Sequence, residues 1–577
     1  MESTAQAVRP KGQTVKTQSS PRDVKNSLLS KLGNLFTGDH INASGGVQYM
    51  HKNFGRDSAI SALFILDMLK NTNDAQNQRE GHYVLEQVTR SLVHWQGQKS
   101  AKTGGHWRKN AEEPGKIHHE AGPIKIDDIA LARNWQEADD QDSDVLVYYG
   151  SVDSTPLFVR LVSEYVGYLR GDDATGKRAY HLLMSRVQNY RGVEVTVAEA
   201  VSQAVTWICV QLLSSELGLL EYQRRPGQER GMPNQTWKDS LTSYVHLNGQ
   251  LVNTNRPVAS IEIQALAYDA LLNAAELFEN DVLLANAARI SPTQTKNWRL
   301  QATRLRSSLI EHFWLADQKR FVQALDRHPK SGHLRAVETP SSNELHLLNS
   351  RLFDELDDQT KQVYLESLVR QATSDDFLTD LGIRCRARSQ YKLINFADYH
   401  GSWAVWPWES HWIAMGLRRQ GFTKLADEVD RRISNAFTVS GGYLEYFLVD
   451  PRDNSAFYRF VPLDWGLVPQ RRTSAIAATN MPDAPQAWSL TAAIDIEAVS
   501  YTVQRVRQSD NNLWLAGLEK EILLQIEHAP LITDASQISR LRETSQAAII
   551  DRMGGWLADE RYHRMAGTPT PVLLPAV

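Results

Sequence analysis

Hydrophobic residues recur at spacings of three and four along most of the chain from about residue 56 onward. This periodicity is typical of amphipathic α-helices that bury one face. It predicts helices over residues 56–71, 80–97, 154–170, 195–217, 257–278, 293–314, 358–373, 402–419, 423–438 and 485–505. Strand-like alternation is confined to short segments such as Phe321–Leu325 and Tyr443–Val449. The pattern therefore predicts a mainly α protein with a few short β-hairpins.

The connections between these helices differ greatly in length. Some are very short, such as 419–423, whereas others are long and rich in polar and aromatic residues, namely 98–152, 218–256, 374–401 and 439–484. Helical hairpins arranged in a ring, with short turns at one end, would bring the long loops together on one face, where binding residues usually lie. Because no repeat of fixed period is present, a closed barrel is favoured over an open solenoid.

The division of the chain into parts follows from the same pattern. Residues 1–40 are polar, mildly basic and poor in aromatic residues, which predicts a flexible tail. Residues 41–577 are expected to form a single catalytic domain, whose last part from about residue 506 adds flanking helices over 512–530 and 536–556.

Charge and composition narrow the possible partners and the compartment. The 63 basic and 67 acidic residues give a net charge of -4, which provides no field for binding nucleic acid. The longest nearly apolar run, Ala204–Leu213, is about half a membrane span, and the amino terminus lacks an apolar segment. The two cysteines, Cys209 and Cys385, fit reduced buried thiols. We therefore expect a cytoplasmic protein that binds neither nucleic acid nor membranes.

Two carboxylic acids in long loops are candidates for proton transfer. Asp239 follows Trp237 and Lys238, and an aromatic wall raises the pKa of a neighbouring carboxyl so that it can donate a proton. Glu445 lies in the aromatic, glycine-led segment Gly441–Phe447 and could activate a water molecule. Each acid taken alone also fits a structural role, as a helix cap or an exposed hairpin residue.

Five motifs, in a fixed order, carry a resemblance to a known family. They are Phe54–Ser58 (FGRDS), Glu113–Glu120 (EPGKIHHE), Tyr148–Phe158 (YYGSVDSTPLF), Thr236–Ser240 (TWKDS) and Ala484–Ser489 (APQAWS). With these motifs the chain resembles bacterial glycogen-debranching glycosidases of the amylo-α-1,6-glucosidase type, which are six-hairpin proteins related in fold to glucoamylases. The second and third motifs are long enough to be specific, and the resemblance spans residues 50 to 490.

The resemblance implies a fold, an activity and two catalytic residues. The fold is an (α/α)6 six-hairpin barrel with its long loops on one face. The activity is hydrolysis of a terminal α-linked glucose with inversion, in which Asp239 is the general acid and Glu445 the general base. Arg56 and Asp57 are similar to an Arg-Asp pair that binds sugar hydroxyls, which suits a guanidinium that donates beside a carboxylate that accepts.

Further residues are expected to line a sugar pocket. Aromatic faces stack on the apolar face of a pyranose, and polar groups beside them bind its hydroxyls. The candidates for substrate binding are Tyr149, Asp153, Trp237, Lys238, Glu262, Gln264, Arg384, Trp403, Gln486 and Trp488. The cluster His118, His119 and Glu120 lacks the spacing of a zinc helix, so no metal and no cofactor are expected.

Two alternative functions stay open on the sequence alone. A sugar epimerase or isomerase on an α-barrel would use histidines such as His400 and His411 to move a proton. A glycan-binding protein without activity would not need its acid pair. The linkage, the length of the substrate, which could be an α-glucan or a small α-glucoside, and the oligomeric state are also left open.

Overall fold

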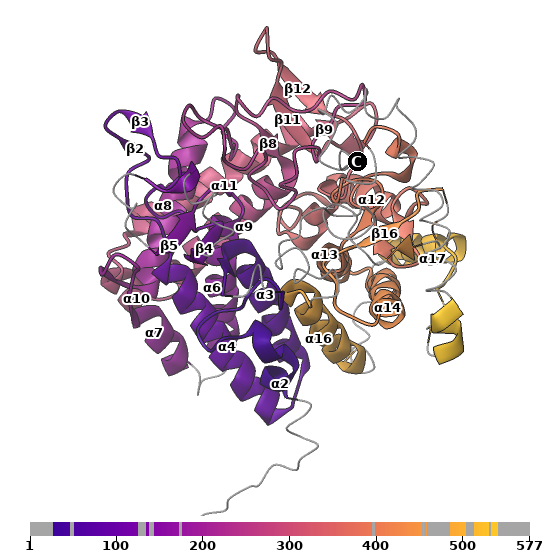
Figure 1. The fold of residues 1–577 in the computed structure, drawn as a ribbon, viewed down its shortest axis with the longest axis horizontal. Helices are drawn as coiled ribbons and strands as arrows, with labels where there is room; N and C mark the ends of the chain where they lie inside the picture. Colours follow the sequence, from indigo (N-terminus) through magenta and orange to yellow (C-terminus); the bar gives the residue numbers. More distant parts are fainter. Residues whose placement is uncertain are drawn as a thin grey trace, which may run out of the picture.

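The fold is seen in a computed structural model of the chain (Figure 1). It describes residues 27–46, 51–124, 134–137, 144–171, 176–394, 398–452, 454, 457–458, 485–502, 513–529, 532 and 534–540. The predicted helix over 536–556 and the first part of the predicted tail lie largely outside the described residues.

The architecture is mainly α, as the hydrophobic pattern predicted. Within the described part of the chain, a set of inner elements contact one another in a closed cycle, each touching the next and the last touching the first. In chain order these are α3 (Gly55–Asn71), α6 (Ser154–Arg170), α9 (Ile261–Glu279), η4 (Glu344–Asn349), α13 (Pro407–Arg419) and α16 (Ala487–Thr502). The cycle closes where α16, near the end of the chain, packs along α3 (Figure 1).

A second set of helices lies outside this cycle. They are α4 (Ala75–His94), α8 (Val197–Ser214), α11 (Pro292–Phe313), α12 (Asp358–Thr373), α14 (Thr423–Ser440) and α17 (Leu513–Gln525). Each packs against one or more inner elements, except α17, which contacts α12 and α14. The ten helices predicted from the periodicity between residues 56 and 505 are present. The three- and four-residue spacing places the apolar residues of each helix on one face, which packs into the protein.

Several short elements are less evident in the sequence. They are α2 (Leu28–Leu32), η1 (Gly33–Leu35), α7 (Gly176–Met184), α10 (Val282–Ala287) and η5 (Arg388–Gln390). Their length gives too few hydrophobic repeats for a periodic signal. Two outer helices instead begin with strong local signals, since Thr196 with Glu199 and Ser291 with Gln294 form capping boxes before α8 and α11.

The predicted flexible tail over residues 1–40 is wrong for its last third. Leu28, Leu32 and Leu35 are at most 2% exposed and pack into the main core. Ser27 caps α2 through its side chain, and Asn77 and Glu80 of α4 accept hydrogen bonds from the backbone of Leu28 and Leu29. The spacing of these leucines follows one helical face, a signal too short to stand out in a polar segment.

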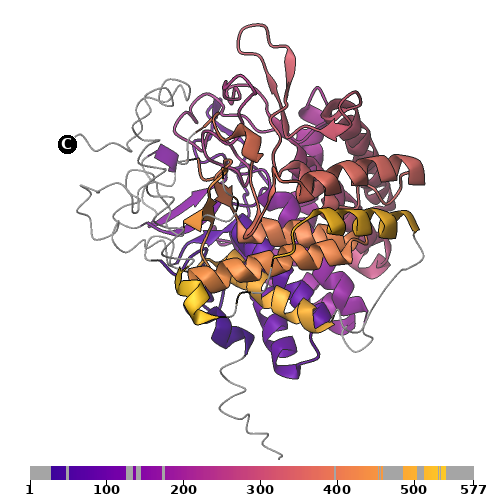
Figure 2. The same ribbon diagram turned by 90° about the vertical axis from the view of Figure 1, so that its right-hand side faces the viewer.

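Short antiparallel sheets lie among the loops, as expected. Three of them have three strands: β1 (Asn53–Phe54), β4 (Glu120–Pro123) and β5 (Val145–Tyr148); β8 (Ala259–Ser260), β11 (Ala324–Arg327) and β12 (Leu334–Val337); and β15 (Ala404–Val405), β16 (Phe447–Val449) and β17 (Phe457–Tyr458). The β11–β12 hairpin projects from the body of the protein (Figures 1 and 2).

The remaining strands pair in twos. These are β2 (Lys102–Thr103) with β3 (His106–Trp107), β6 (Arg186–Gln188) with β7 (Glu194–Thr196), β9 (Trp314–Leu315) with β10 (Arg320–Phe321), and β13 (Leu378–Thr379) with β14 (Gly382–Ile383). The predicted alternation over Phe321–Leu325 and Tyr443–Val449 corresponds to β10, β11 and β16.

One described helix, α8, is apolar and long enough to pass a length-and-composition test for a membrane span, and 56% of it is buried. It packs against α6, α9 and α11. Because helices at the centre of a folded domain have the same composition, core packing accounts for its apolar character.

A buried charge network joins three helices of the core. The imidazole of His411 on α13 lies 2.8 Å from Asp430 on α14 and 2.9 Å from Asp495 on α16. Burial alone would lower the pKa of His411, but the charge of Asp430 and hydrogen bonds with both aspartates raise it to about 9. The imidazolium therefore links α13 to α14 and to α16 at neutral pH.

We expect this network to make the stability of the protein depend on pH. The folded pKa of His411, about 9, lies above its ordinary value of 6.5, so its contribution is full below pH 6.5 and is lost as the pH rises toward 9. The Tm measured by calorimetry should fall over this range, and His411→Gln should lower the Tm at pH 6.5 and flatten the fall. The exposed variant His333→Gln serves as the control; an equal slope in both variants would contradict the assignment.

Candidate active site

The amino-terminal ends of the inner elements meet at one end of the cycle. Each carries a carboxylate or an aromatic residue there: Asp57 on α3, Asp153 before α6, Glu262 on α9, Glu344 on η4, Glu409 on α13 and Trp488 on α16. Because a helix amino terminus carries positive partial charge, it stabilises nearby anions. The long loops of the sequence enter this same end, which is where the candidate residues gather.

A three-stranded sheet brings the first three motifs together. β4 pairs with β1 on one side and with β5 on the other, so Phe54 lies opposite Glu120 and Glu120 opposite Tyr148. Gly55 then begins α3, and a Cβ there would lie 2.2 Å from the carbonyl oxygen of His118. Only glycine permits this close approach, which sets the position of Arg56 one residue later.

Arg56 is the centre of the candidate site. Its guanidinium donates to Asp153 at 2.9 Å and to Asp239 at 3.3 Å, and its Nε lies 3.9 Å from Asp57. The arginine side chain is only 5% exposed. Asp153 is the residue before α6, but its side chain does not cap the helix. Its carboxylate is bound to Arg56 instead.

Asp239 has a firmly defined position and remains reachable from solvent. Its side chain is 17% exposed, and its two oxygens accept hydrogen bonds from Arg56 and from the hydroxyl of Tyr399 at 3.1 Å. Burial raises the pKa of Asp239, although the charge of Arg56 and the Tyr399 hydrogen bond act in the opposite direction. The carboxyl is thus oriented by two donors, and burial partly opposes its ionisation.

Glu445 lies in the electrostatic field of the same cluster. Burial raises its pKa to about 8, and the negative charges of Asp57 and then Asp239 act in the same direction. Burial likewise raises the pKa of Asp57 to about 7, against the effect of Arg56. Among the described residues, Glu445 has no hydrogen-bond or ion-pair partner, so its carboxylate is free to bind water or a substrate.

Aromatic residues surround these acids. Trp406 stacks on Tyr446 with ring centres 5.1 Å apart, and Tyr399 lies 6.0 Å from Tyr446 in a parallel arrangement. Trp237 packs edge-on against Trp408 at 4.9 Å, and Trp408 stacks on Trp488 at 5.1 Å. Of these rings, only Trp237 and Trp488 were sequence candidates.

Tyr399 is an additional site residue because it donates to Asp239, and Trp406, Trp408 and Tyr446, each 2% exposed, are buried around the site. Tyr446 follows Glu445 directly, and the other three lie in the segment 398–409, which joins a long loop to the start of α13. The aromatic density of Trp403–Trp408 was the available signal. It did not separate core tryptophans from residues at the acids, because Trp403, Trp406 and Trp408 are all at most 2% exposed.

Lys238 is placed away from the site. Its ammonium donates to Ser341 at 2.9 Å, Ser342 at 2.7 Å and the carbonyl of Cys385 at 2.7 Å, and it lies 4.0 Å from Glu409. The side chain is completely buried. Its three donors are therefore occupied, and the structure corrects the expected substrate contact: Lys238 anchors the loop of the acid.

Five other candidates are buried for structural reasons. Glu262 is hydrogen-bonded to Tyr244 and Ser260, while Gln264 bonds the backbone of Leu220. Arg384 donates to the carbonyls of Ser402, Val449 and Asp450, and Tyr149 donates to the carbonyl of Trp95. Trp403 is 1% exposed. These arrangements replace the expected contacts with sugar, since each polar side chain already binds protein groups.

Gln486 lies at the rim of the candidate site. Its backbone bonds the carbonyl of Tyr443 and bridges to Ser44, and its side chain is partly exposed just before α16 begins. Its substrate contact stays a prediction. Within the described residues, no group of three or more His, Cys, Asp or Glu side chains is placed to hold a metal ion.

Comparison with known proteins tests the resemblance. The family model described as amylo-alpha-1,6-glucosidase matches residues 138–393. The resemblance is confirmed over this segment. It includes Asp153 and Asp239 and lies between Arg56 and Glu445 in sequence. The match supports a glycoside hydrolase, and no curated protein matches the chain as a whole or in part.

Solved structures also resemble the chain. A GH63 mannosylglycerate hydrolase from Thermus thermophilus in complex with glucose has a TM-score of 0.47 and 14% identity, covering 81% of this chain and 98% of that chain. A protein described as wild-type glycosidase has a TM-score of 0.41 and 13% identity, covering 81% of this chain and 93% of that chain.

The anchoring role of Lys238 predicts a large loss of stability in Lys238→Met. The change leaves the buried Glu409 and the Ser342 hydroxyl without the ammonium, and removing one partner of a buried charge pair costs about 3 kcal/mol or more. Urea unfolding followed by circular dichroism measures the free energy of unfolding. Lys330→Met, at an exposed turn, is the matched control, and equal unfolding midpoints in the two variants would refute the role.

Proposed function

We propose that the protein hydrolyses a terminal α-linked glucose with inversion of the anomeric configuration, at the open end of an (α/α)6 barrel. The observation that carries the proposal is that Asp239 and the loop of Glu445 come together beside Arg56 and Asp57: Arg56 binds Asp239, and Tyr399, which donates to Asp239, packs on Tyr446 next to Glu445. The closed cycle of inner elements, each with an outer helix packed against it, supports the barrel.

Asp239 is the proposed general acid. It would protonate the glycosidic oxygen, and its position is set by Arg56 and Tyr399, which hold one oxygen each. Glu445 is the proposed general base. A water molecule bound by its unpartnered carboxylate would attack the anomeric carbon from the other face of the sugar. Inversion needs space for that water, with the carboxyls about 6.5 to 9.5 Å apart.

The cluster controls how many protons the site holds. Asp57, Asp239 and Glu445 all have a raised pKa around a single arginine, so they do not all ionise at neutral pH. Arg56 and Tyr399 favour the ionised form of Asp239, which places the shared proton on Glu445 before a substrate binds. Such coupled groups titrate together. The proposed roles therefore require the proton to move to Asp239 as the substrate enters and displaces water.

Unused hydrogen-bonding atoms at the site support sugar binding. Arg56 Nε and Asp153 Oδ1 are buried, and neither has a hydrogen-bond partner among the described residues. Buried polar atoms without partners are costly, and a donor beside an acceptor suits vicinal hydroxyls. We propose that they bind the hydroxyls of the terminal glucose, with the partly exposed ring of Tyr399 as an aromatic neighbour.

The finer identity of the substrate follows from the family match. An α-1,6-linked glucose of a trimmed glycogen branch is the first candidate, and a short α-glucan or a small α-glucoside is the alternative. We propose a cytoplasmic location, because Cys209 and Cys385 are both buried free thiols, which suits a reducing compartment.

The two histidines suggested for an epimerase are unsuited to moving a proton. Burial holds the pKa of His400 well below its ordinary value, and nearby cations act in the same direction. His411 is held as an imidazolium between Asp430 and Asp495 in the core. These environments favour hydrolysis by the acid pair over epimerisation.

The proposal predicts β-glucose as the first product from isomaltose, panose or a glycogen limit dextrin. Proton NMR during the first minutes distinguishes it from α-glucose. Asp239→Asn and Glu445→Gln should each lower kcat by about 10²- to 10⁴-fold, because each removes one proton-transfer group. Glu216→Gln, which changes a side chain that is 89% exposed, is the control. Release of α-glucose would rule out inversion.

α-Glucosyl fluoride assigns the two roles separately. Fluoride leaves with little protonic help, so Asp239→Asn should keep most activity on this substrate, whereas Glu445→Gln should lose it. The opposite result would exchange the roles of the two acids.

The pH profile should depend on Asp57. Hydrolysis needs one proton on the acid pair, so kcat/KM should fall as the pH rises through the highest pKa of the pair, near 8 for Glu445. Asp57 raises that pKa, and Asp57→Asn should therefore move the basic limb to lower pH. Asp39→Asn, at a residue whose side chain is 76% exposed, should leave the limb in place. If the basic limb of the pH profile stayed in place in Asp57→Asn, the result would contradict the effect of Asp57 on the pKa of Glu445.

A further inference from the structure

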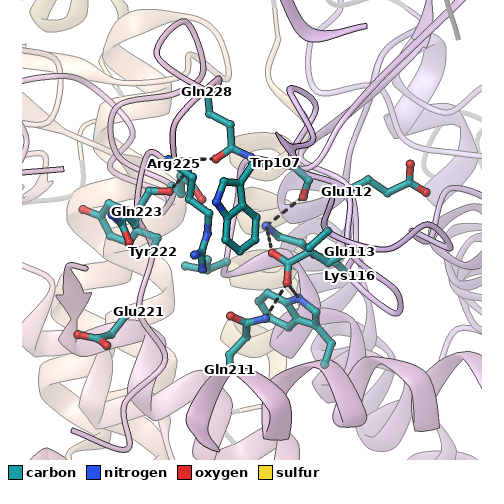
Figure 3. A pocket seen from close by; sticks show the side chains of 15 residues that line it. Trp107, Glu112, Glu113, Lys116, Gln211, Glu221, Tyr222, Gln223, Arg225 and Gln228 are labelled. Atoms are coloured by element: carbon teal, nitrogen blue, oxygen red, sulfur yellow. Dashed lines mark hydrogen bonds and ion pairs between the residues drawn. The ribbon is translucent and has the colours of Figure 1, made fainter. Parts of the chain in front are cut away.

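A second pocket lies beside the candidate active site (Figure 3). Its wall is built from three parts of the chain: Trp107 at the end of β3, Glu113 and Lys116 from the second motif, and Arg225 from the loop after α8. Trp207 on α8 also lines the pocket, and Figure 3 shows the ring of Trp107 beside the side chain of Arg225. None of these residues belongs to the acid cluster described above.

Two cations in this pocket have spare hydrogen-bond donors. The guanidinium of Arg225 stacks on the ring of Trp107, 3.9 Å from its centre. Among the described residues, no carboxylate or carbonyl accepts a hydrogen bond from that guanidinium. Lys116 is 2% exposed, and its ammonium is 5.5 Å from the centre of the Trp207 ring. Within the part of the chain that the structure describes, the ammonium makes one long hydrogen bond, 3.5 Å, to the carbonyl of Ala111.

The nearby acids do not neutralise both cations. Glu113 Oε1 is 3.8 Å from the Lys116 ammonium, while its Oε2 accepts hydrogen bonds from Trp207 at 3.2 Å and Gln211 at 2.7 Å. The other lining acids have partners of their own: Glu112 pairs with Arg191 and Glu221 with Arg327. Two cations therefore face the single charge of Glu113, which offsets only one of them.

Burial of uncompensated charge is unfavourable, and this pocket shows the effect. Burial lowers the pKa of Lys116 and of Arg225, although Glu113 acts in the opposite direction on both. An anion placed between the two cations would remove this penalty and would receive charge-assisted hydrogen bonds from both.

We propose that this pocket binds the anionic group of a small ligand, a carboxylate or a phosphate, between Lys116 and Arg225. The cavity volume is about 20 Å³, which is room for about one water-sized group, so only an oxygen-bearing edge of the anion enters and the rest of the ligand stays outside. The ring of Trp107 would cover the apolar part next to that group.

The pocket shares its walls with the catalytic loops. Val152, which lines it, precedes Asp153, and Gln235, which also lines it, is four residues before Asp239. The anion therefore has two possible sources. It is either an acidic group on the substrate itself, a case that rests on the proposed function, or a separate small anion that binds alongside the substrate.

Calorimetric titration with inorganic phosphate and with acetate, at constant ionic strength, tests the site without any need for activity. We expect saturable binding that is weakened about 10-fold or more in Arg225→Gln, since a charge-assisted bond is lost. Arg224→Gln removes the same charge from a neighbour that binds Thr254 and lies outside the pocket, and it should bind as the wild type does. Lys116→Gln, checked for folding by circular dichroism, should weaken binding as well.

Kinetics then distinguish the two sources. If the anion belongs to the substrate, Arg225→Gln should lower kcat/KM for a glucoside of a hydroxy acid by about 10-fold relative to isomaltose. If the anion is separate, phosphate should change isomaltose hydrolysis in the wild type and in Arg224→Gln but not in Arg225→Gln. Absence of heat with both probes, or equal binding by the two arginine variants, would overturn the site. A protein that binds phosphate but cleaves no glycoside would refute the proposed function alone.

Discussion

The candidate site depends on one buried cation surrounded by carboxylates. Arg56 binds Asp153 and Asp239 directly, with Asp57 close by, and the charges of Asp57 and Asp239 extend to Glu445. One positive charge cannot offset four negative ones in a poorly hydrated place, so part of the cluster must stay protonated. A site of this kind holds at neutral pH the proton that acid catalysis uses. The site retains this proton because several carboxylates pack around Arg56. The retention is a property of the whole cluster and does not depend on one acid alone.

The fold creates this arrangement by bringing the amino-terminal ends of the inner elements to one end. Backbone N–H groups at these ends favour anions, which offsets part of the cost of gathering carboxylates there. The β1–β4–β5 sheet then fixes how α3 enters the ring, because Gly55 must pack against the carbonyl of His118. The motifs that carry the resemblance therefore combine residues of the candidate site with residues that only set the path of the chain.

The helices could be predicted from sequence because each buries a periodic face, and the acid Asp239 could be found because a motif surrounds it. The direction of a side chain within a loop could not be predicted from the sequence. Trp237, Lys238 and Asp239 are consecutive, yet Lys238 points into the protein toward Ser341 while Asp239 binds Arg56 at the site. Tyr399 was missed for the same reason, since nothing in the sequence relates it to a carboxyl 160 residues away. Contacts between distant loops follow from the closed cycle of helices, which periodicity alone does not specify.

The proposed acid, Asp239, and the proposed base, Glu445, depend on different parts of that cycle. Asp239 lies within the matched segment 138–393 and is held from behind by Lys238, which bonds the segment 341–385. Glu445 follows α14, and its loop is tied to α16 because Ser489 donates to the carbonyl of Leu444. Arg56 stands on α3, against which α16 packs. The three groups meet only when α16 closes the cycle on α3, so the matched segment holds the acid but cannot by itself form the site.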